Sequence, residues 1–283
     1  MKKYLITVLG FLLSNVSNAQ LDDFEQAKKM AVATNKIIVV DFWATWCGPC
    51  KKMDVDVWSN TEVLKVMDDF IFVKIDIDRN RELTTKYGVN SIPNIFIFDS
   101  FGKKLDSNNG YMNQKETLSF LDSYRLNTEF FSKEAIEYFK KPSFNTSINL
   151  ATKMLDYSLY LKKPQAQKFV YNAMDYLKDA KKELNKKETD YEDKLKKIQL
   201  LELYEYVYNF NFEKLNKKLE NFEGVVFADF LNKNHYYFLK YLSNFEENKT
   251  EEKQKFFNDL EGFSYFKEKA DSIYNLYLEK NKS

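Results

Sequence analysis

A Cys-X-X-Cys motif between an apolar run and a potential helix constrains this chain more than any other feature. The β-branched run Ile37–Val40 predicts a buried strand, and Gly48-Pro49 separates it from residues that can be helical. A strand that leads into a helix through this motif places Cys47 at the helix N-terminus, where unpaired N–H groups and the helix dipole favour a thiolate. Cys47 and Cys50 are the only cysteines of the chain. Each can therefore react only with the other or with an outside partner.

The residues around this motif resemble the thioredoxin family over about residues 21–124. Trp46–Lys51 matches the family's active-site motif letter for letter, and Asp41, six residues before the first cysteine, matches its buried aspartate. Lys74 matches the lysine near that aspartate, and Pro93 stands where the family has a cis-proline. The resemblance implies an α/β thioredoxin fold, a central mixed sheet flanked by helices.

One position departs from the family pattern. Val55 stands where the family has a helix-breaking proline, so the helix after the motif is expected to be straighter or to end near Trp58. The run Lys51–Met53 followed by Val57–Asn60 is more similar to thioredoxin-like domains of exported bacterial proteins than to cytoplasmic thioredoxin. Apolar periodicity predicts strands at 37–42, 70–77, 94–98 and 103–106. Helices are predicted at 21–35, from about residue 47 onward, from residue 60 or 61 to 67, at 81–87 and at 115–124.

The resemblance also implies a role for each site residue. Cys47 is expected to attack a substrate disulfide, Cys50 to resolve the mixed disulfide, and Asp41 to take the proton of Cys50. The alternative for Asp41 is a structural carboxylate paired with Lys74, because a buried carboxylate without a partner is costly. A cis bond before the proline would present the Ile92 backbone to an extended substrate. The expected substrate-binding residues are Trp46, Gly48, Pro49, Ile92 and Pro93.

No cofactor beyond the redox-active pair Cys47–Cys50 is expected. Zinc sites also use Cys-X-X-Cys, but they need a second pair of ligands. The chain has no further cysteine and a single histidine, His235, within an aromatic stretch. The sequence therefore predicts no metal site, and we interpret His235 as a partly buried substitute for an aromatic residue.

Composition and the N-terminus bound the location of the protein. The 43 Lys and Arg nearly equal the 42 Asp and Glu, so no global field indicates nucleic-acid binding. Lys2 and Lys3, the apolar run Tyr4–Leu13 and a small-residue cleavage site before Gln20 predict a signal peptide at residues 1–19, cleaved near Ala19-Gln20. The apolar run is too short to span a bilayer, although an uncleaved anchor is the alternative. We expect an exported, periplasmic protein.

The chain changes character after Leu126. The length of 283 residues allows two domains, expected at 20–126, thioredoxin-like, and 127–283, all-helical. Apolar residues recur at three- and four-residue spacing in the second part, which predicts amphipathic helices. These helices form either an irregular bundle or repeat-like pairs. Its many tyrosines either fill a core or form a surface for a protein partner. Helices are predicted at 129–140, 146–161, 165–184, 189–209, 212–222, 225–245, 251–260 and 264–280.

These features predict an exported thiol–disulfide oxidoreductase. Gly48 and Pro49 give the first cysteine no charged or imidazole neighbour, and a less stabilised thiolate makes a more reducing pair. We therefore expect reduction of protein disulfides, with electrons from an upstream donor embedded in the membrane. The alternatives are a disulfide oxidase or isomerase, and a partner-binding helical protein with a redox-sensing thioredoxin-like module.

Overall fold

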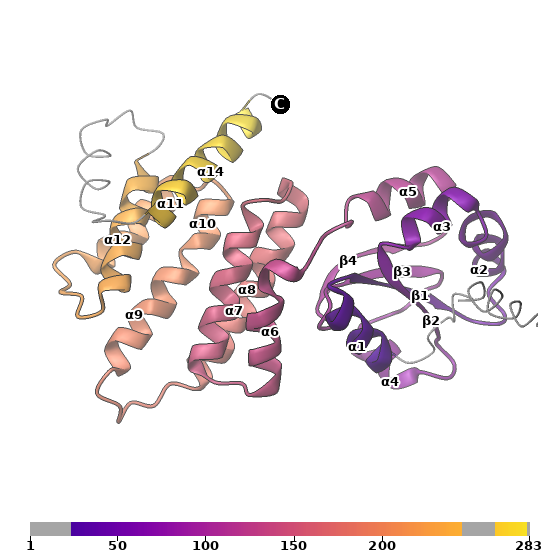
Figure 1. The fold of residues 1–283 in the computed structure, drawn as a ribbon, viewed down its shortest axis with the longest axis horizontal. Coiled ribbons are helices and arrows are strands. Elements are labelled where there is room, and N and C mark those ends of the chain that lie inside the picture. The colour runs from indigo at the N-terminus through magenta and orange to yellow at the C-terminus, as the bar shows by residue number, and fades with distance from the viewer. Residues whose placement is uncertain (1–23, 245–263, 282–283) are drawn as a thin grey trace, which may run out of the picture. The chain divides into compact units, whose positions relative to one another are not determined.

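The computed structural model describes residues 24–244 and 264–281 (Figure 1). The predicted signal peptide and the helix predicted at 251–260 lie outside these described residues. The chain divides into two compact units, the first ending at Arg125 and the second beginning at Leu126. No helix in the described ranges is both long and apolar enough to cross a membrane.

The first unit is built on a four-stranded mixed sheet with the strand order β2-β1-β3-β4. Strand β1 (Ile37–Trp43) pairs in parallel with β2 (Phe70–Asp76) and antiparallel with β3 (Asn94–Phe98). Strand β4 (Lys104–Asn109) pairs antiparallel with β3. The predicted thioredoxin fold is confirmed. Strand β4 begins one residue later than predicted and continues to Asn109.

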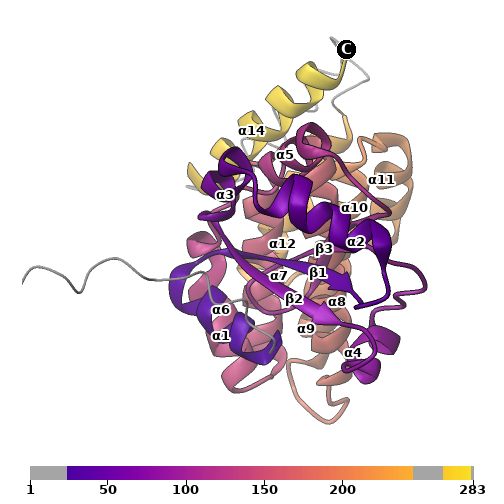
Figure 2. The same ribbon diagram turned by 90° about the vertical axis from the view of Figure 1, so that its right-hand side faces the viewer.

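Helices cover both faces of this sheet (Figures 1 and 2). On one face, helix α1 (Phe24–Thr34) packs on alternate residues of β1, among them Val40 and Phe42, and helix α4 (Arg81–Lys86) lies on the same side. The opposite face carries helices α2 (Gly48–Met53), α3 (Thr61–Met67) and α5 (Gln114–Asp122). Successive residues of a strand point to opposite faces of the sheet. Val39, Asp41 and Trp43, which alternate with Val40 and Phe42, therefore project toward α2 and α3.

The helix after the cysteine motif changes its winding at Asp54. Helix α2 ends at Met53 and continues as one π-helical turn, η1 (Asp54–Trp58), which buries Val57 and Trp58 and leaves Val55 72% exposed. The helical segment therefore ends at Trp58, one of the two outcomes expected from the missing proline. Asn60 then caps α3 by accepting hydrogen bonds from the amides of Glu62 and Val63.

The second unit contains only helices among its described residues. In chain order they are α6 (Glu129–Lys140), α7 (Phe144–Ser158), α8 (Lys163–Lys182), α9 (Tyr191–Glu202), α10 (Tyr204–Tyr208), α11 (Phe212–Leu219), the 3-10 turn η2 (Glu220–Phe222), α12 (Phe230–Ser243) and α14 (Ser264–Asn281). Neighbouring helices pack in sequence, α6 on α7 and α7 on α8, and α12 contacts α9, α11 and α14.

Two predicted helices of this unit differ most from the structure, while those predicted at 146–161 and 165–184 are shifted by two to three residues. The helix predicted at 189–209 is divided at Leu203, where i to i−3 hydrogen bonds from Leu203 and Tyr206 tighten the chain. The helix predicted from 225 begins only at Phe230, because Asp229 accepts hydrogen bonds from the amides two and three residues later and so fixes the helix start. Helix α6 has the predicted bounds.

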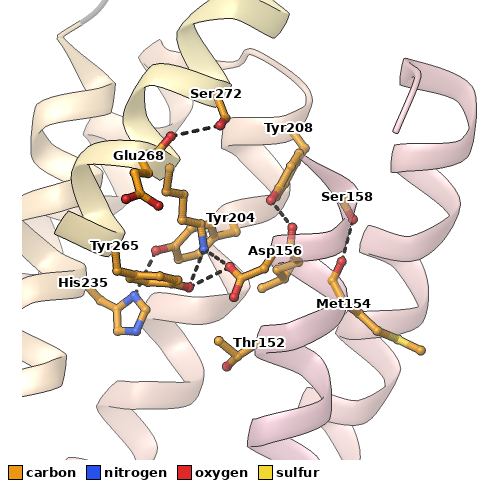
Figure 3. A network of polar contacts seen from close by, with 12 residues as sticks. Thr152, Met154, Asp156, Ser158, Tyr204, Tyr208, His235, Tyr265, Glu268 and Ser272 are labelled. Atoms are coloured by element: carbon orange, nitrogen blue, oxygen red, sulfur yellow. Dashed lines mark hydrogen bonds and ion pairs between the residues drawn. The ribbon is translucent and has the colours of Figure 1, made fainter. Parts of the chain in front are cut away.

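A buried ion pair fastens the last described helix to the unit's interior (Figure 3). The Nζ of Lys269 on α14 donates to Oδ1 of Asp156 on α7 at 2.7 Å, and the Tyr265 hydroxyl donates to the same oxygen at 2.7 Å. Lys269 is 3% exposed and Asp156 6% exposed, and the ammonium lies 4.3 Å from the ring centroid of Tyr204. Burying these charges is tolerable only because they satisfy each other.

His235 lies in the same core and is fully buried rather than partly so. Its Nδ1 is 2.9 Å from the Tyr204 hydroxyl, and its ring meets Phe266 edge-on. Burial, with the nearby Lys269 ammonium, lowers the pKa of His235 to about 3. The tyrosines of this unit are divided between its core and its surface. Four of them fill the core, namely Tyr157, Tyr176, Tyr204 and Tyr208. Tyr160 and Tyr171 are exposed, and Tyr206 is half-buried.

Candidate active site

The first cysteine occupies the N-cap of α2, as the motif predicts. Cys47 has an extended backbone, with φ −79° and ψ 102°, and its Sγ accepts a hydrogen bond from the Cys50 amide at 3.1 Å. Pro49 lies in the first helical turn. Cys47 and Cys50 form a disulfide with their Cα atoms 5.3 Å apart, and they are 3% and 0% exposed. A sulfur at this position lies close to the unpaired amides of a helix start.

The surface around the disulfide brings together the residues expected to bind substrate. Trp46 is 65% exposed, and its Nε1 donates to Oδ2 of Asp78 at 2.8 Å, which fixes the indole at the rim of the site. Gly48 and Pro49 are also exposed. The Ile92–Pro93 peptide bond is cis, as predicted, and the Ile92 side chain packs against the cystine. The cystine, an exposed aromatic face and the Ile92 segment therefore share one surface.

Asp41 and Lys74 are neighbours because of the sheet register. They are direct partners across the parallel pair β1–β2, on the face that carries α2. Asp41 is 1% exposed and Lys74 5% exposed, and Lys74 Nζ lies 3.6 Å from Asp41 Oδ2. The same Oδ2 accepts a hydrogen bond from Trp58 Nε1 at 3.1 Å, while Oδ1 has no hydrogen-bond partner within the described residues.

Trp43 connects this buried pair to the disulfide. Its side chain packs against the cluster formed by Ala44, Cys47 and Cys50, and its ring centroid lies 4.8 Å from Lys74 Nζ. The indole is half-buried. One aromatic ring therefore contacts both the Lys74 ammonium and the cluster that contains the two cysteines.

The electrostatics of this pocket favour a protonated Asp41 at unusually high pH. Burial raises the pKa of Asp41 to about 6, and the negative charge of Asp54 acts in the same direction. The Lys74 ammonium and the Trp58 hydrogen bond oppose this rise without cancelling it. A carboxyl group with a pKa of about 6 can both accept and release a proton near neutral pH.

Sequence reasoning missed two residues of this site, Asp54 and Trp58. Asp54 forms a close ion pair with Lys74, and Trp58 binds the Asp41 carboxylate through its indole. The available signal was spacing: Asp54 follows Cys50 by four residues, which places the two on the same face of a helix. Among the described residues, no group of three or more histidine, cysteine or acidic side chains is arranged to hold a metal ion.

Comparison with known proteins identifies the family. Residues 16–123 match the model of the thioredoxin family. The chain is 38% identical over 90 residues to thioredoxin of Mycoplasmoides gallisepticum. The aligned segment covers 32% of this chain and 86% of that protein. It is 42% identical over 80 residues to Drosophila melanogaster thioredoxin-1, covering 28% of this chain and 72% of that protein. A solved structure of the Drosophila germline thioredoxin Deadhead covers 37% of this chain and 97% of its own, at 34% identity and a TM-score of 0.32.

A cystine at a helix N-cap on a mixed sheet defines the first unit as a thioredoxin-fold redox module. The chain belongs to the thioredoxin family. It is a thiol–disulfide oxidoreductase whose redox-active pair is Cys47–Cys50. The family model ends at residue 123, ahead of the second unit.

Proposed function

We propose that the protein is an exported reductase of protein disulfides. The observation that carries the direction is the environment of Cys47 at the start of α2. Its sulfur receives one backbone hydrogen bond, while Gly48 and Pro49 offer it no side-chain donor and no charge. Lys51 and Lys52 are exposed, where solvent screens their effect on the sulfur. A thiolate with little stabilisation makes the reduced pair a good electron donor.

In the proposed reaction, the reduced pair transfers two electrons to a substrate disulfide. The Cys47 thiolate attacks one substrate sulfur, a Cys47–substrate disulfide forms, and the other substrate sulfur leaves as a thiolate. Cys50 then attacks Cys47, its proton passes to the Asp41 carboxylate, and the second substrate sulfur leaves. The Cys47–Cys50 disulfide is regenerated and the substrate dithiol is released. We expect an extended substrate segment to dock against the Ile92 backbone and the exposed face of Trp46 during these steps.

The redox potential tests the proposed direction. We expect the mature protein, with both of its units, to equilibrate with glutathione almost wholly in its oxidised form, with a potential near the roughly −270 mV typical of thioredoxin. Pro49→His places an imidazole beside the Cys47 sulfur and should shift the potential toward oxidising values. A wild-type potential near the roughly −120 mV of strong oxidants would support the oxidase alternative instead.

Export is part of the proposal. It is supported by Lys2 and Lys3, by the apolar run Tyr4–Leu13 and by the small-residue cleavage site before Gln20. Mass spectrometry of the protein from its native cell should find Gln20, or its cyclised form, at the mature N-terminus. Recovery of the full-length chain in the membrane fraction would contradict export by cleavage. In an oxidising compartment the reduced pair needs an electron donor, and we propose one embedded in the membrane.

Binding of a protein partner by the second unit stays a prediction. That unit has a groove of about 820 Å³, lined by aromatic and aliphatic side chains and by charged side chains of both signs. The groove is lined by residues of α8, α9, α10 and α11 and of the turn after them, among them Tyr171, Met174, Leu203, Tyr206 and Phe222.

A further inference from the structure

Two carboxylates share the buried Lys74 ammonium. Its Nζ forms a close ion pair with Oδ1 of Asp54, whereas Oδ2 of Asp41 lies farther away at 3.6 Å. Asp41 is the more buried of the two acids, at 1% exposed against 38% for Asp54. Burial strengthens the attraction of unlike charges, so the ammonium would be expected closer to the buried Asp41. It lies instead closer to the partly exposed Asp54.

The local backbone places Asp54 within reach of Lys74. Asp54 is the first residue of the π-helical turn, and its amide donates to the carbonyls of Cys50 and Lys51. The turn then buries Trp58, whose indole donates to Asp41. Asp54 and Trp58 thus contact the two members of the buried pair from one short segment that follows directly from the cysteine helix.

Each effect of the Asp54 charge favours proton uptake by Asp41. The charge draws the ammonium away from Asp41, and it also repels a second negative charge nearby. The charged groups that face Asp41 are Lys74 from β2 and Asp54 from η1, while Trp58 contributes a neutral donor. Lys74 and Trp58 both contact Oδ2 of Asp41, and Oδ1 has no partner within the described residues. Oδ1 is therefore the oxygen available for a proton.

We propose that Asp54 is a positioning residue of the disulfide reaction, which competes with Asp41 for the Lys74 ammonium and so keeps the Asp41 carboxylate basic enough to take the proton of Cys50. The inference rests on the proposed role of Asp41 as proton acceptor. In the resolving step the Cys50 S–H bond breaks and its proton passes to Asp41. The Cys47–Cys50 bond forms as the Cys47–substrate bond breaks, and the substrate sulfur leaves with the electron pair.

The test uses reduced full-length protein and dithionitrobenzoate, whose thiolate is coloured. Attack by Cys47 releases one thionitrobenzoate, and attack by Cys50 on the resulting mixed disulfide releases the second, so the second phase reports the resolving step. Asp54→Asn removes the charge at nearly constant shape. We expect the acidic limb of the second phase's pH profile to move down by about one pH unit, and its plateau to fall about threefold, because a less basic carboxylate is a weaker proton acceptor.

Three comparisons make this test specific. Carboxyl NMR titration of Asp41 should show the same downward shift of its pKa in Asp54→Asn, while Asp54→Glu should retain the wild-type profile. Asp56→Asn, at an exposed position of the same π turn, should change neither measurement. An unmoved Asp41 titration, or a moved titration with an unmoved second phase, overturns the inference. A strongly oxidising potential would instead remove the proposed reductase function and leave the second phase measurable, so the two failures are distinguishable.

Discussion

Asp156→Ala is expected to destabilise the helical unit by about 3–5 kcal/mol, because it leaves the Lys269 ammonium buried without a counterion. Both side chains are almost fully buried, and Lys269 is 2.7 Å from the carboxylate that would be lost. The Tyr265 hydroxyl loses the same acceptor. Helix α14 is the element that should detach first, because this contact joins it to α7 across 113 residues of sequence.

Urea unfolding can measure this effect with a control built into the chain. All three tryptophans, Trp43, Trp46 and Trp58, lie in the first unit, so their fluorescence reports that unit, whereas far-ultraviolet circular dichroism is dominated by the helices of the second. Asp156→Ala should lower the midpoint of the circular dichroism transition and leave the fluorescence transition unchanged.

Two further variants separate the buried pair from general sensitivity of the helices. Asp175→Ala removes an exposed ion pair with Lys178 and should cost less than about 1 kcal/mol. Asp156→Ala combined with Lys269→Met removes both charges and should regain much of the lost stability. If the single Asp156 variant loses no more than the Asp175 variant, the buried pair does not hold α14 in place.

Local patterns in the sequence were enough to predict the strands and the start of the cysteine helix, whereas the mixed sheet was expected from the family resemblance. The β-branched run beginning at Ile37 is buried throughout, and the Cys-X-X-Cys motif starts a helix for reasons that depend only on neighbouring residues. Asp229 could also have been recognised as an N-cap, because the preference of aspartate for that position is local. The predicted start at residue 225 gave more weight to apolar spacing than to this cap.

The missing parts of the site depend on contacts between distant segments. The register of β1 against β2 places Asp41 beside Lys74, and the π turn then brings Asp54 to the same ammonium. Neither a strand register nor a π turn has a reliable signature in one sequence. The same limit applies to Lys269 and Asp156, whose pairing depends on how α14 packs in the folded unit.

Cys50→Ser should convert the proposed catalyst into a trap. In this variant the Cys47 thiolate can still attack a substrate disulfide, but no second thiol remains to release the product. The mixed disulfide should therefore accumulate with substrate proteins and be released by dithiothreitol. Cys47→Ser retains only Cys50, which is 0% exposed and lies within α2 rather than at its N-cap. This variant should therefore form almost no adducts.

Trapping in the native compartment, followed by non-reducing electrophoresis and mass spectrometry, is the most direct test that Cys47 is the attacking sulfur of a disulfide reductase. We expect abundant adducts linked through Cys47 for Cys50→Ser and almost none for Cys47→Ser. Equal trapping by the two variants, or none by either, would contradict the assignment of Cys47 as the attacking sulfur.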